Sequence, residues 1–167
     1  MFNSFRTEIK WALIFVATML AWMLLERVIG LHDTHIDKHA IYTNFFAIPA
    51  IAVYVFALLD KRKNDYNGVM NYKQGFLSGL IITVIVTVLT PITQYITTVV
   101  ITPDFFTNII EYSVQQGEMT REAAEGQFNT KNYIIMGMVG ALIMGILTTS
   151  VVAFFTKKNT PTRENDI

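Results

Sequence analysis

Residues 75–101, GFLSGLIITVIVTVLTPITQYITTVVI, run for 27 residues without a charged side chain. A helix needs about 20 apolar residues to cross roughly 30 Å of hydrocarbon, so this run is long enough to span a membrane. A helix is also the expected form, because a membrane span must satisfy its backbone hydrogen bonds internally. The stretch therefore predicts an all-α integral membrane protein.

Three further apolar runs lie outward from this stretch along the chain. Together the four runs predict spans at about residues 10–31, 40–59, 74–101 and 132–156. A soluble helical bundle would need a polar stripe along most of these runs, and the last three carry only isolated Asn, Gln, Thr and Ser. We expect residues 1–156 to form a single four-helix transmembrane domain, followed by a disordered cytoplasmic tail at 157–167.

Composition narrows the classes of protein further. The 13 Lys and Arg residues balance the 13 Asp and Glu residues, so the formal net charge is zero. A nucleic-acid binder would carry a basic excess, and none is present. The chain has no cysteine, which excludes disulfides, Cys-based zinc sites and thiol nucleophiles.

The charges are distributed unevenly between the two predicted sides of the membrane. Nine basic and five acidic residues fall in the two termini and the loop at 60–73, against four basic and eight acidic residues in the segments at 26–39 and 102–132. Because the side richer in Lys and Arg normally faces the cytoplasm, both termini are expected there.

The long segment at 102–130, between the third and fourth spans, is expected to be helical. Thr102-Pro103-Asp104 is a typical helix start, and apolar residues then recur at helical spacing up to Val114. This pattern predicts an amphipathic, extracytoplasmic helical segment. Such a segment either lies on the membrane surface or folds over the bundle as a lid.

All three histidines of the chain fall within eight residues. His32, His35 and His39 would share one face of a helix, and imidazoles bind Zn²⁺ or Cu²⁺. The chain must turn between the first two spans, however, so the alternative is a polar turn whose side chains cap helix ends.

Four polar residues are expected near the outer ends of the spans, and they define a hypothetical substrate pocket: Glu26, Arg27, Asn44 and Gln94. A charged side chain that points inward near a membrane boundary is a candidate functional residue. The alternative is a network of interhelical hydrogen bonds that only fixes packing.

Small residues recur every four positions in the third and fourth spans, at Gly75, Gly79, Gly137, Ala141 and Gly145. Such faces let helices approach closely. They predict close packing, either within the bundle or at a contact with a second copy or another membrane protein.

Sequence motifs for enzymes are absent. The chain has no Walker A loop, no Gly-rich dinucleotide motif, no HExxH and no nucleophile elbow. We therefore expect a non-enzymatic protein with no cofactor.

Four short motifs resemble those of a bacterial family of four-span membrane proteins, the domain-of-unknown-function family number 4199. They are Gly30-Leu31-His32-Asp33, Phe46-Ala47-Ile48-Pro49, Asn71-Tyr72-Lys73-Gln74-Gly75-Phe76 and Ile101-Thr102-Pro103-Asp104-Phe105-Phe106. The resemblance covers nearly the whole chain and implies a multi-pass protein of the bacterial inner membrane. It also implies an association with glycosyltransferases that act on polyprenyl phosphates, and it brings no site residues.

Three functions are consistent with these patterns. The first is a small scaffold subunit that binds a membrane partner through its small-residue faces. The second is a transporter or flippase-like component for a small or lipid-linked substrate, which would use the polar pocket. The third is a metal-binding sensor built on the histidines.

Overall fold

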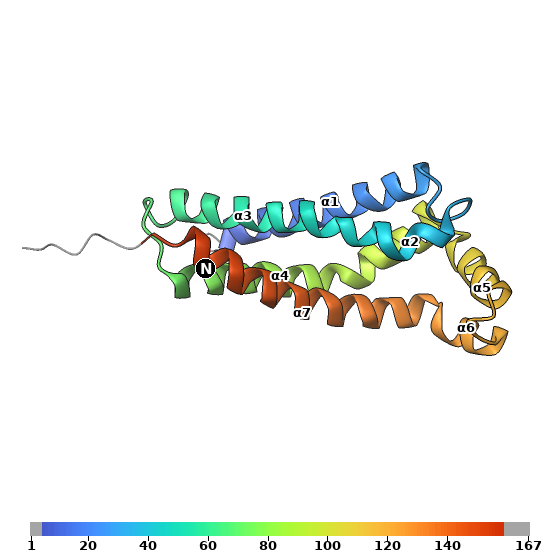
Figure 1. Ribbon diagram of the computed structural model, residues 1–167. Helices are drawn as coiled ribbons and strands as arrows, with labels where there is room; N and C mark the ends of the chain where they lie inside the picture. The colour runs from blue at the N-terminus through green and yellow to red at the C-terminus, as the bar shows by residue number, and fades with distance from the viewer. Residues whose placement is uncertain (1–4, 159–167) are drawn as a thin grey trace, which may run out of the picture.

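The computed structural model describes residues 5–158, and its architecture is a bundle of long helices capped at one end by short ones (Figure 1). The long helices are α1 (Arg6–Val28), α3 (Ala47–Asn64), α4 (Tyr72–Ile96) and α7 (Thr130–Thr156). The short elements are α2 (Ile36–Tyr42), the 3₁₀ turn η2 (Thr43–Phe46), the π-helical turn η3 (Thr97–Ile101), α5 (Phe105–Gln115) and α6 (Arg121–Gln127). The predicted all-α fold, with a helical segment between the third and fourth spans, is confirmed.

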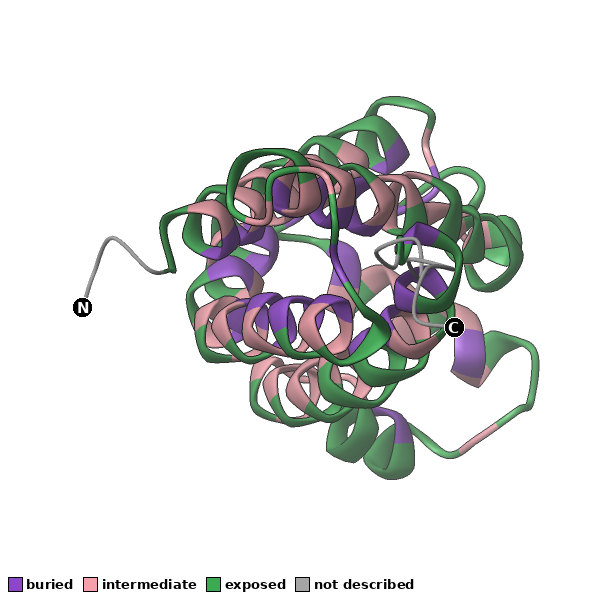
Figure 2. Cartoon of the chain, turned by 90° about the vertical axis from the view of Figure 1, so that its left-hand side faces the viewer, coloured by how far each residue is buried: buried purple, intermediate pink, exposed green. Residues whose placement is uncertain are grey.

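Four helical stretches are long and apolar enough to cross a membrane, and they contain 23 to 30 residues each. At 1.5 Å per residue they measure about 35 to 45 Å, which exceeds the hydrocarbon thickness. Buried residues face the centre of the bundle, whereas the outward faces are exposed (Figure 2). Large apolar side chains such as Leu13, Val88 and Val139 lie on those outward faces. The chain is therefore a membrane-spanning helical bundle.

The boundaries of the elements differ from the predicted ones at several points. The first helix ends at Val28, because Gly30 adopts a left-handed conformation with φ +79° and reverses the chain. The second span begins earlier than residue 40, since α2 and η2 continue into α3. The fourth span begins at Thr130, where the Asn129 side chain accepts a hydrogen bond from the Asn132 amide. Most of the tail predicted at 157–167 lies outside the described residues.

The small residues of the third and fourth spans mediate the contact between α4 and α7. A Cβ atom placed on Gly79 would lie 2.6 Å from the Thr149 side chain, and one on Gly145 would lie 2.6 Å from Thr83 Oγ1. Gly75 likewise lies against Ala153. Each glycine thus receives a threonine or alanine of the facing helix, which allows the two backbones to approach closely. Of the five predicted packing residues, Gly75, Gly79 and Gly145 are used here within one chain, whereas Gly137 and Ala141 line a cavity that is described below.

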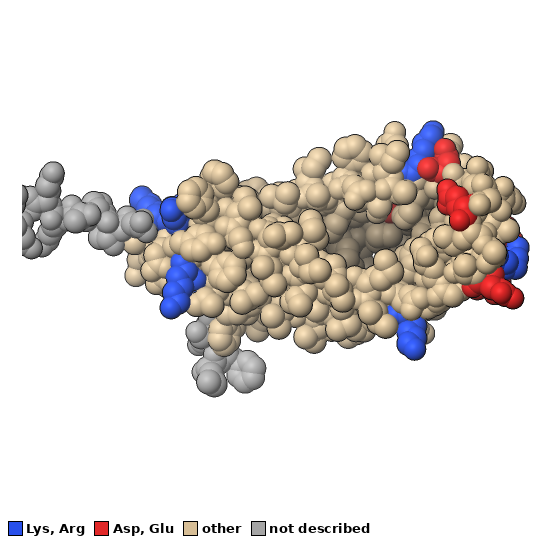
Figure 3. All heavy atoms as spheres, turned by 60° about the horizontal axis from the view of Figure 1, so that its bottom comes forward, with Lys and Arg blue, Asp and Glu red and all other residues tan. Residues whose placement is uncertain are grey.

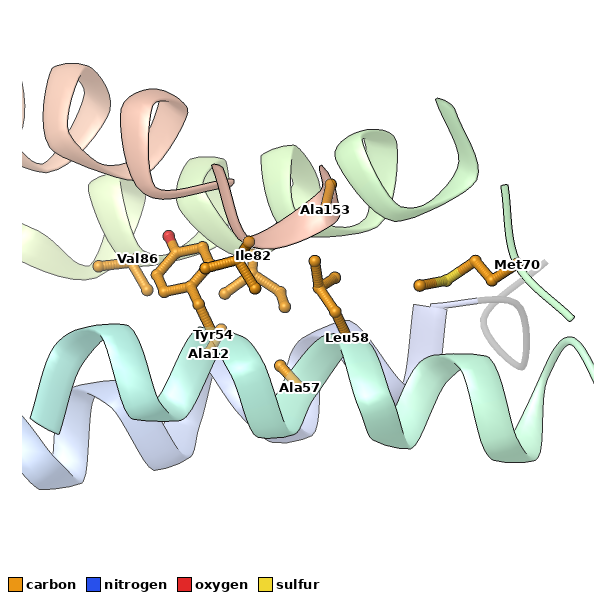
Figure 4. Packing of buried hydrophobic residues seen from close by; sticks show 9 residues of the cluster. Ala12, Tyr54, Ala57, Leu58, Met70, Ile82, Val86 and Ala153 are labelled. Carbon is orange, nitrogen blue, oxygen red and sulfur yellow. The ribbon is translucent and has the colours of Figure 1, made fainter. Parts of the chain in front are cut away.

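The apolar core lies between the helices in the half of the bundle that holds the chain termini, which we call the terminal end (Figure 4). Leu58 of α3, Ile82 of α4 and Ala153 of α7 are fully buried there. Tyr54 is also buried, and its hydroxyl lies 2.7 Å from Thr83 Oγ1. The phenol therefore satisfies its polar atom inside the bundle.

A buried ion pair joins three helices at the terminal end. Glu8 of α1 is almost inaccessible, and its carboxylate lies 2.9 Å from Nζ of Lys61 and accepts a hydrogen bond from the Ser78 hydroxyl at 2.8 Å. Lys61 also lies 2.8 Å from Asp65, at the end of α3. Although burial raises the pKa of Asp65, hydrogen bonds from Lys61 and Thr7 hold it below its usual range. The network links α1, α3 and α4.

Candidate functional site

The opposite end of the bundle, which we call the distal end, carries α2, α5 and α6 (Figure 1). The chain reaches it through a Schellman motif at the end of α1, in which the Gly30 amide donates to the Arg27 carbonyl and the Leu31 amide donates to the Glu26 carbonyl. This motif needs the left-handed conformation of Gly30. The reversal folds His32 back onto the last turn of α1.

Glu26 is the centre of a cluster of buried polar side chains. Its side chain is 1% exposed. Trp22 Nε1 donates to Oε1 at 2.5 Å, while His32 Nε2 lies 3.1 Å and His39 Nδ1 lies 3.8 Å from Oε2. A carboxylate buried without such partners would be strongly unfavourable. Glu26, His32 and His39 form what we call the Glu26–histidine cluster.

An aromatic ring from α5 closes this cluster. The centroid of the Phe105 ring lies 5.2 Å from that of His32 and 4.9 Å from that of His39. Asn108, one turn further along α5, donates to the His32 carbonyl at 2.9 Å. Helix α5 therefore folds over this end of the spans, as the lid alternative predicts, and Phe105 covers the two histidines.

Hydrogen bonding within the cluster is incomplete. His32 Nδ1 and His39 Nδ1 are both buried and have no hydrogen-bond partner among the described residues. His39 Nδ1 is 3.8 Å from Glu26, which is too far for a hydrogen bond. Leaving a buried polar atom unpaired costs roughly 1–3 kcal/mol. The histidines are therefore not explained by the hydrogen bonds that they make.

The histidines predicted to gather on one helical face divide into two groups. His32 and His39 come together, but His35 is exposed and lies outside the cluster. The helical spacing does not apply, because residues 29–35 form a turn and α2 begins only at Ile36. Glu26 takes the third place, so the expected set of three histidines is corrected to two histidines and one glutamate.

In the turn that follows α1, a hydrogen bond from the Thr34 amide holds the pKa of the Asp33 carboxyl below its usual range.

A cavity of about 410 Å³ lies beside the cluster, between the helices. Its walls come from α1, η2, α3, α4 and α7, and most of them are apolar. The polar side chains on the walls are Thr43, Asn44, Tyr54, Thr90, Thr93, Gln94 and Thr148. Figure 3 shows the hollow in the half of the bundle nearer α5 and α6, on a face where charged side chains gather only at the two ends. We call it the lateral cavity.

The structure brings together two of the four residues predicted to form a substrate pocket. Asn44 and Gln94 line the lateral cavity from opposite helices, whereas Glu26 and Arg27 do not. Arg27 is exposed, and Nη1 lies 3.5 Å from the Val100 carbonyl. One residue advances a helix by about 100°, so Glu26 facing inward turns Arg27 outward. Thr43, next to Asn44 in the chain, also lines the cavity.

Sequence reasoning missed two features of this region. One is the role of Phe105 as a cover over the histidines, and the other is the pairing of Glu26 with both imidazoles. A signal for the second was present: a glycine two residues beyond the helix end predicts a Schellman reversal, which brings residue 32 near residue 26. The position of Phe105 depends on how α5 docks, for which the sequence holds no comparable signal.

These observations place the molecule among the polytopic α-helical membrane proteins. Within that class the chain belongs to the family described as "Protein of unknown function (DUF4199)", whose model matches residues 10–158. The match includes the first span from Lys10 onward, the other three spans, the Glu26–histidine cluster and the lateral cavity. No curated protein and no solved structure matches the chain.

Proposed function

We propose that this protein binds the chain of an amphiphilic lipid in the lateral cavity and acts as a small, non-enzymatic component of lipid transport or flipping. The observation that carries the proposal is a cavity of about 410 Å³ within the membrane-spanning part of the bundle. Its volume falls in the range of roughly 300–1,000 Å³ that ligand pockets occupy.

The walls of the cavity match the chemistry of such a ligand. Ile51, Val86 and Met144 are among the apolar side chains that would contact a hydrocarbon chain. Asn44 and Gln94 provide amide groups, and Asn44 Nδ2 is already bonded to the Ala40 carbonyl. None of the lining residues is charged, so the cavity favours a neutral headgroup with hydroxyl or sugar groups over a bare phosphate.

Orientation is part of this proposal. The basic residues concentrated around the terminal end favour a cytoplasmic position for both termini in a bacterial inner membrane. The lateral cavity, nearer the distal end, then lies in the outer leaflet. A lipid-linked sugar in that leaflet, with part of its hydrocarbon chain in the uncharged cavity and its phosphate outside it, is the kind of ligand that the implied association with polyprenyl-phosphate glycosyltransferases would supply.

A scaffold role through the small-residue faces has less support. Gly75, Gly79 and Gly145 are occupied by contacts between α4 and α7, so they are not free to receive a partner helix. Gly140 faces open space, but it lines the lateral cavity. The geometry therefore favours a ligand over a protein partner at this face.

The test is to fill the cavity. Gly140→Phe places an aromatic ring in open space on the cavity wall, and Gly126→Phe, on the exposed α6, is the matched control because Gly126 also has no neighbour within 4 Å. Protein purified in mild detergent is analysed by native mass spectrometry for bound lipid. We expect wild type and Gly126→Phe to retain a lipid. The fraction of Gly140→Phe that carries a bound lipid should be at least tenfold lower. Equal retention by all three proteins would overturn the proposal.

A further inference from the structure

The Glu26–histidine cluster presents three metal-ligand atoms to one point. We propose that Glu26, His32 and His39 bind a divalent metal ion of the zinc class. The site is separate from the lipid proposed for the lateral cavity, since none of the three residues lines that cavity. The two proposals can therefore fail independently.

The geometry of the cluster is close to what such an ion needs. The three candidate ligand atoms lie within 4.8 Å of one another, and Glu26 Oε2 is 3.1 Å from His32 Nε2 and 3.8 Å from His39 Nδ1. Ligand atoms about 2.1 Å from a tetrahedral ion stand roughly 3.4 Å apart. Small rotations of the side chains would bring all three atoms into range.

The donor set points to the class of ion. Two imidazole nitrogens and one carboxylate oxygen suit zinc and similar transition metals, whereas Mg²⁺ and Ca²⁺ prefer oxygen ligands throughout. Three protein ligands leave a fourth position for water or another small ligand.

The surroundings of the cluster support a metal over a purely hydrogen-bonded group. Trp22 Nε1 donates to Oε1 of Glu26, which orients the carboxylate and leaves Oε2 directed at the histidines. His39 Nδ1 is buried near Oε2 without a hydrogen-bond partner among the described residues, and a metal ion would provide one.

Burial and access are both suitable for an ion. His32 is 5% exposed and lies under Phe105, so the ligands are held in place and shielded from bulk water. The side chain of His39 is 17% exposed and stands at the edge of the cluster, where an ion can enter. A bound ion would tie the end of α1 to the turn at 29–35 and to α2.

The experiment uses the full chain in mild detergent, without a polyhistidine tag and after treatment with a chelator. Zn²⁺ is titrated by calorimetry, and Co²⁺ is used as a visible-absorption probe of the ligand geometry. The variants are His39→Ala and Glu26→Gln, with His35→Ala as the matched control, because His35 directly precedes α2, the helix that carries His39, but is exposed.

We expect wild type and His35→Ala to bind one Zn²⁺ per chain and to melt at a higher temperature in its presence. Both cluster variants should lose at least tenfold in affinity and show no thermal shift with Zn²⁺. If Glu26→Gln fails to fold, His39→Ala decides, since that side chain lies at the edge of the cluster. The proposal is overturned if wild type binds no Zn²⁺, if His39→Ala binds it as tightly as wild type, or if His35→Ala abolishes binding.

Discussion

At the scale of single residues, the molecule holds carboxylates inside a membrane-spanning bundle at both of its ends. Glu8 is satisfied by Lys61 and Ser78, with nitrogen and hydroxyl donors at 2.9 and 2.8 Å. Glu26 shares its Oε2 between two imidazoles, only one of which lies within hydrogen-bonding distance. This contrast is why the first site is interpreted as structural and the second as a ligand site.

The structural role of Glu8 predicts a loss of stability in Glu8→Gln. Removing one partner of a buried ion pair lowers the free energy of unfolding by about 3–5 kcal/mol. The lower end applies here, because Lys61 still has its ion pair with Asp65 in the variant. The free energy of unfolding, measured by denaturant titration in detergent, should therefore fall by about 3 kcal/mol.

Glu111→Gln is the control for this prediction, since Glu111 is exposed on α5 and should change the stability little. The same Glu8→Gln change made in a Lys61→Met background should cost less than it does alone. An equal cost in both backgrounds would show that the pair is not coupled.

At the scale of elements, the interface between α4 and α7 depends on glycines, whose lack of a side chain lets the two helices approach closely. Gly79 and Thr149 occupy the same contact from opposite helices, and Thr149 Oγ1 is buried without a hydrogen-bond partner among the described residues. A threonine here contributes shape and a polar atom that it does not use. The contact can therefore be tested by enlarging the side chain on one helix and shortening the facing side chain on the other.

Gly79→Ala should destabilise the bundle by about 1–3 kcal/mol, because the new Cβ would lie 2.6 Å from the Thr149 side chain. Thr149→Ala should recover most of that loss in the double variant, since it removes both of the atoms at 2.6 Å. Thermal unfolding of the four proteins in one detergent measures the coupling.

Gly140→Ala is the matched control, because a Cβ at Gly140 meets nothing within 4 Å. Helix propensity alone should then make that variant slightly more stable. Strictly additive effects of Gly79→Ala and Thr149→Ala would show that the two helices do not meet as described.

At the scale of the whole molecule, the two ends of the bundle differ in their charge and in their distance from the lateral cavity. By sequence, basic residues are in excess in the segments of the terminal end and acidic residues in those of the distal end. On the face shown in Figure 3, Asp and Glu appear only in the distal half, where the cavity opens, whereas Lys and Arg appear at both ends. Orientation therefore decides which leaflet can deliver a ligand to the lateral cavity.

The chain has no cysteine, so single cysteines can report this orientation. Lys63→Cys at the terminal end and Glu122→Cys on α6 are both exposed positions. In spheroplasts treated with a membrane-impermeant maleimide, we expect labelling of Glu122→Cys, and labelling of Lys63→Cys only after permeabilisation. The opposite pattern would place the cavity in the inner leaflet.

The four spans, the helical distal segment and the close packing at the small residues could be predicted from the sequence. These features follow from local hydrophobicity and side-chain size, which can be read along the chain without knowing what lies beside it. The pairing of Asn44 with Gln94 across one cavity was also within reach, because both fall near the same end of their spans.

The partners of the buried polar side chains could not be predicted from the sequence and become visible only in the folded bundle. Glu8 meets residues 53 and 70 positions away, and Phe105 covers histidines more than 60 positions before it. Such contacts depend on how each helix is rotated about its axis and on how α5 docks. Those rotations result from packing among all the helices at once, and no single segment of the sequence specifies them.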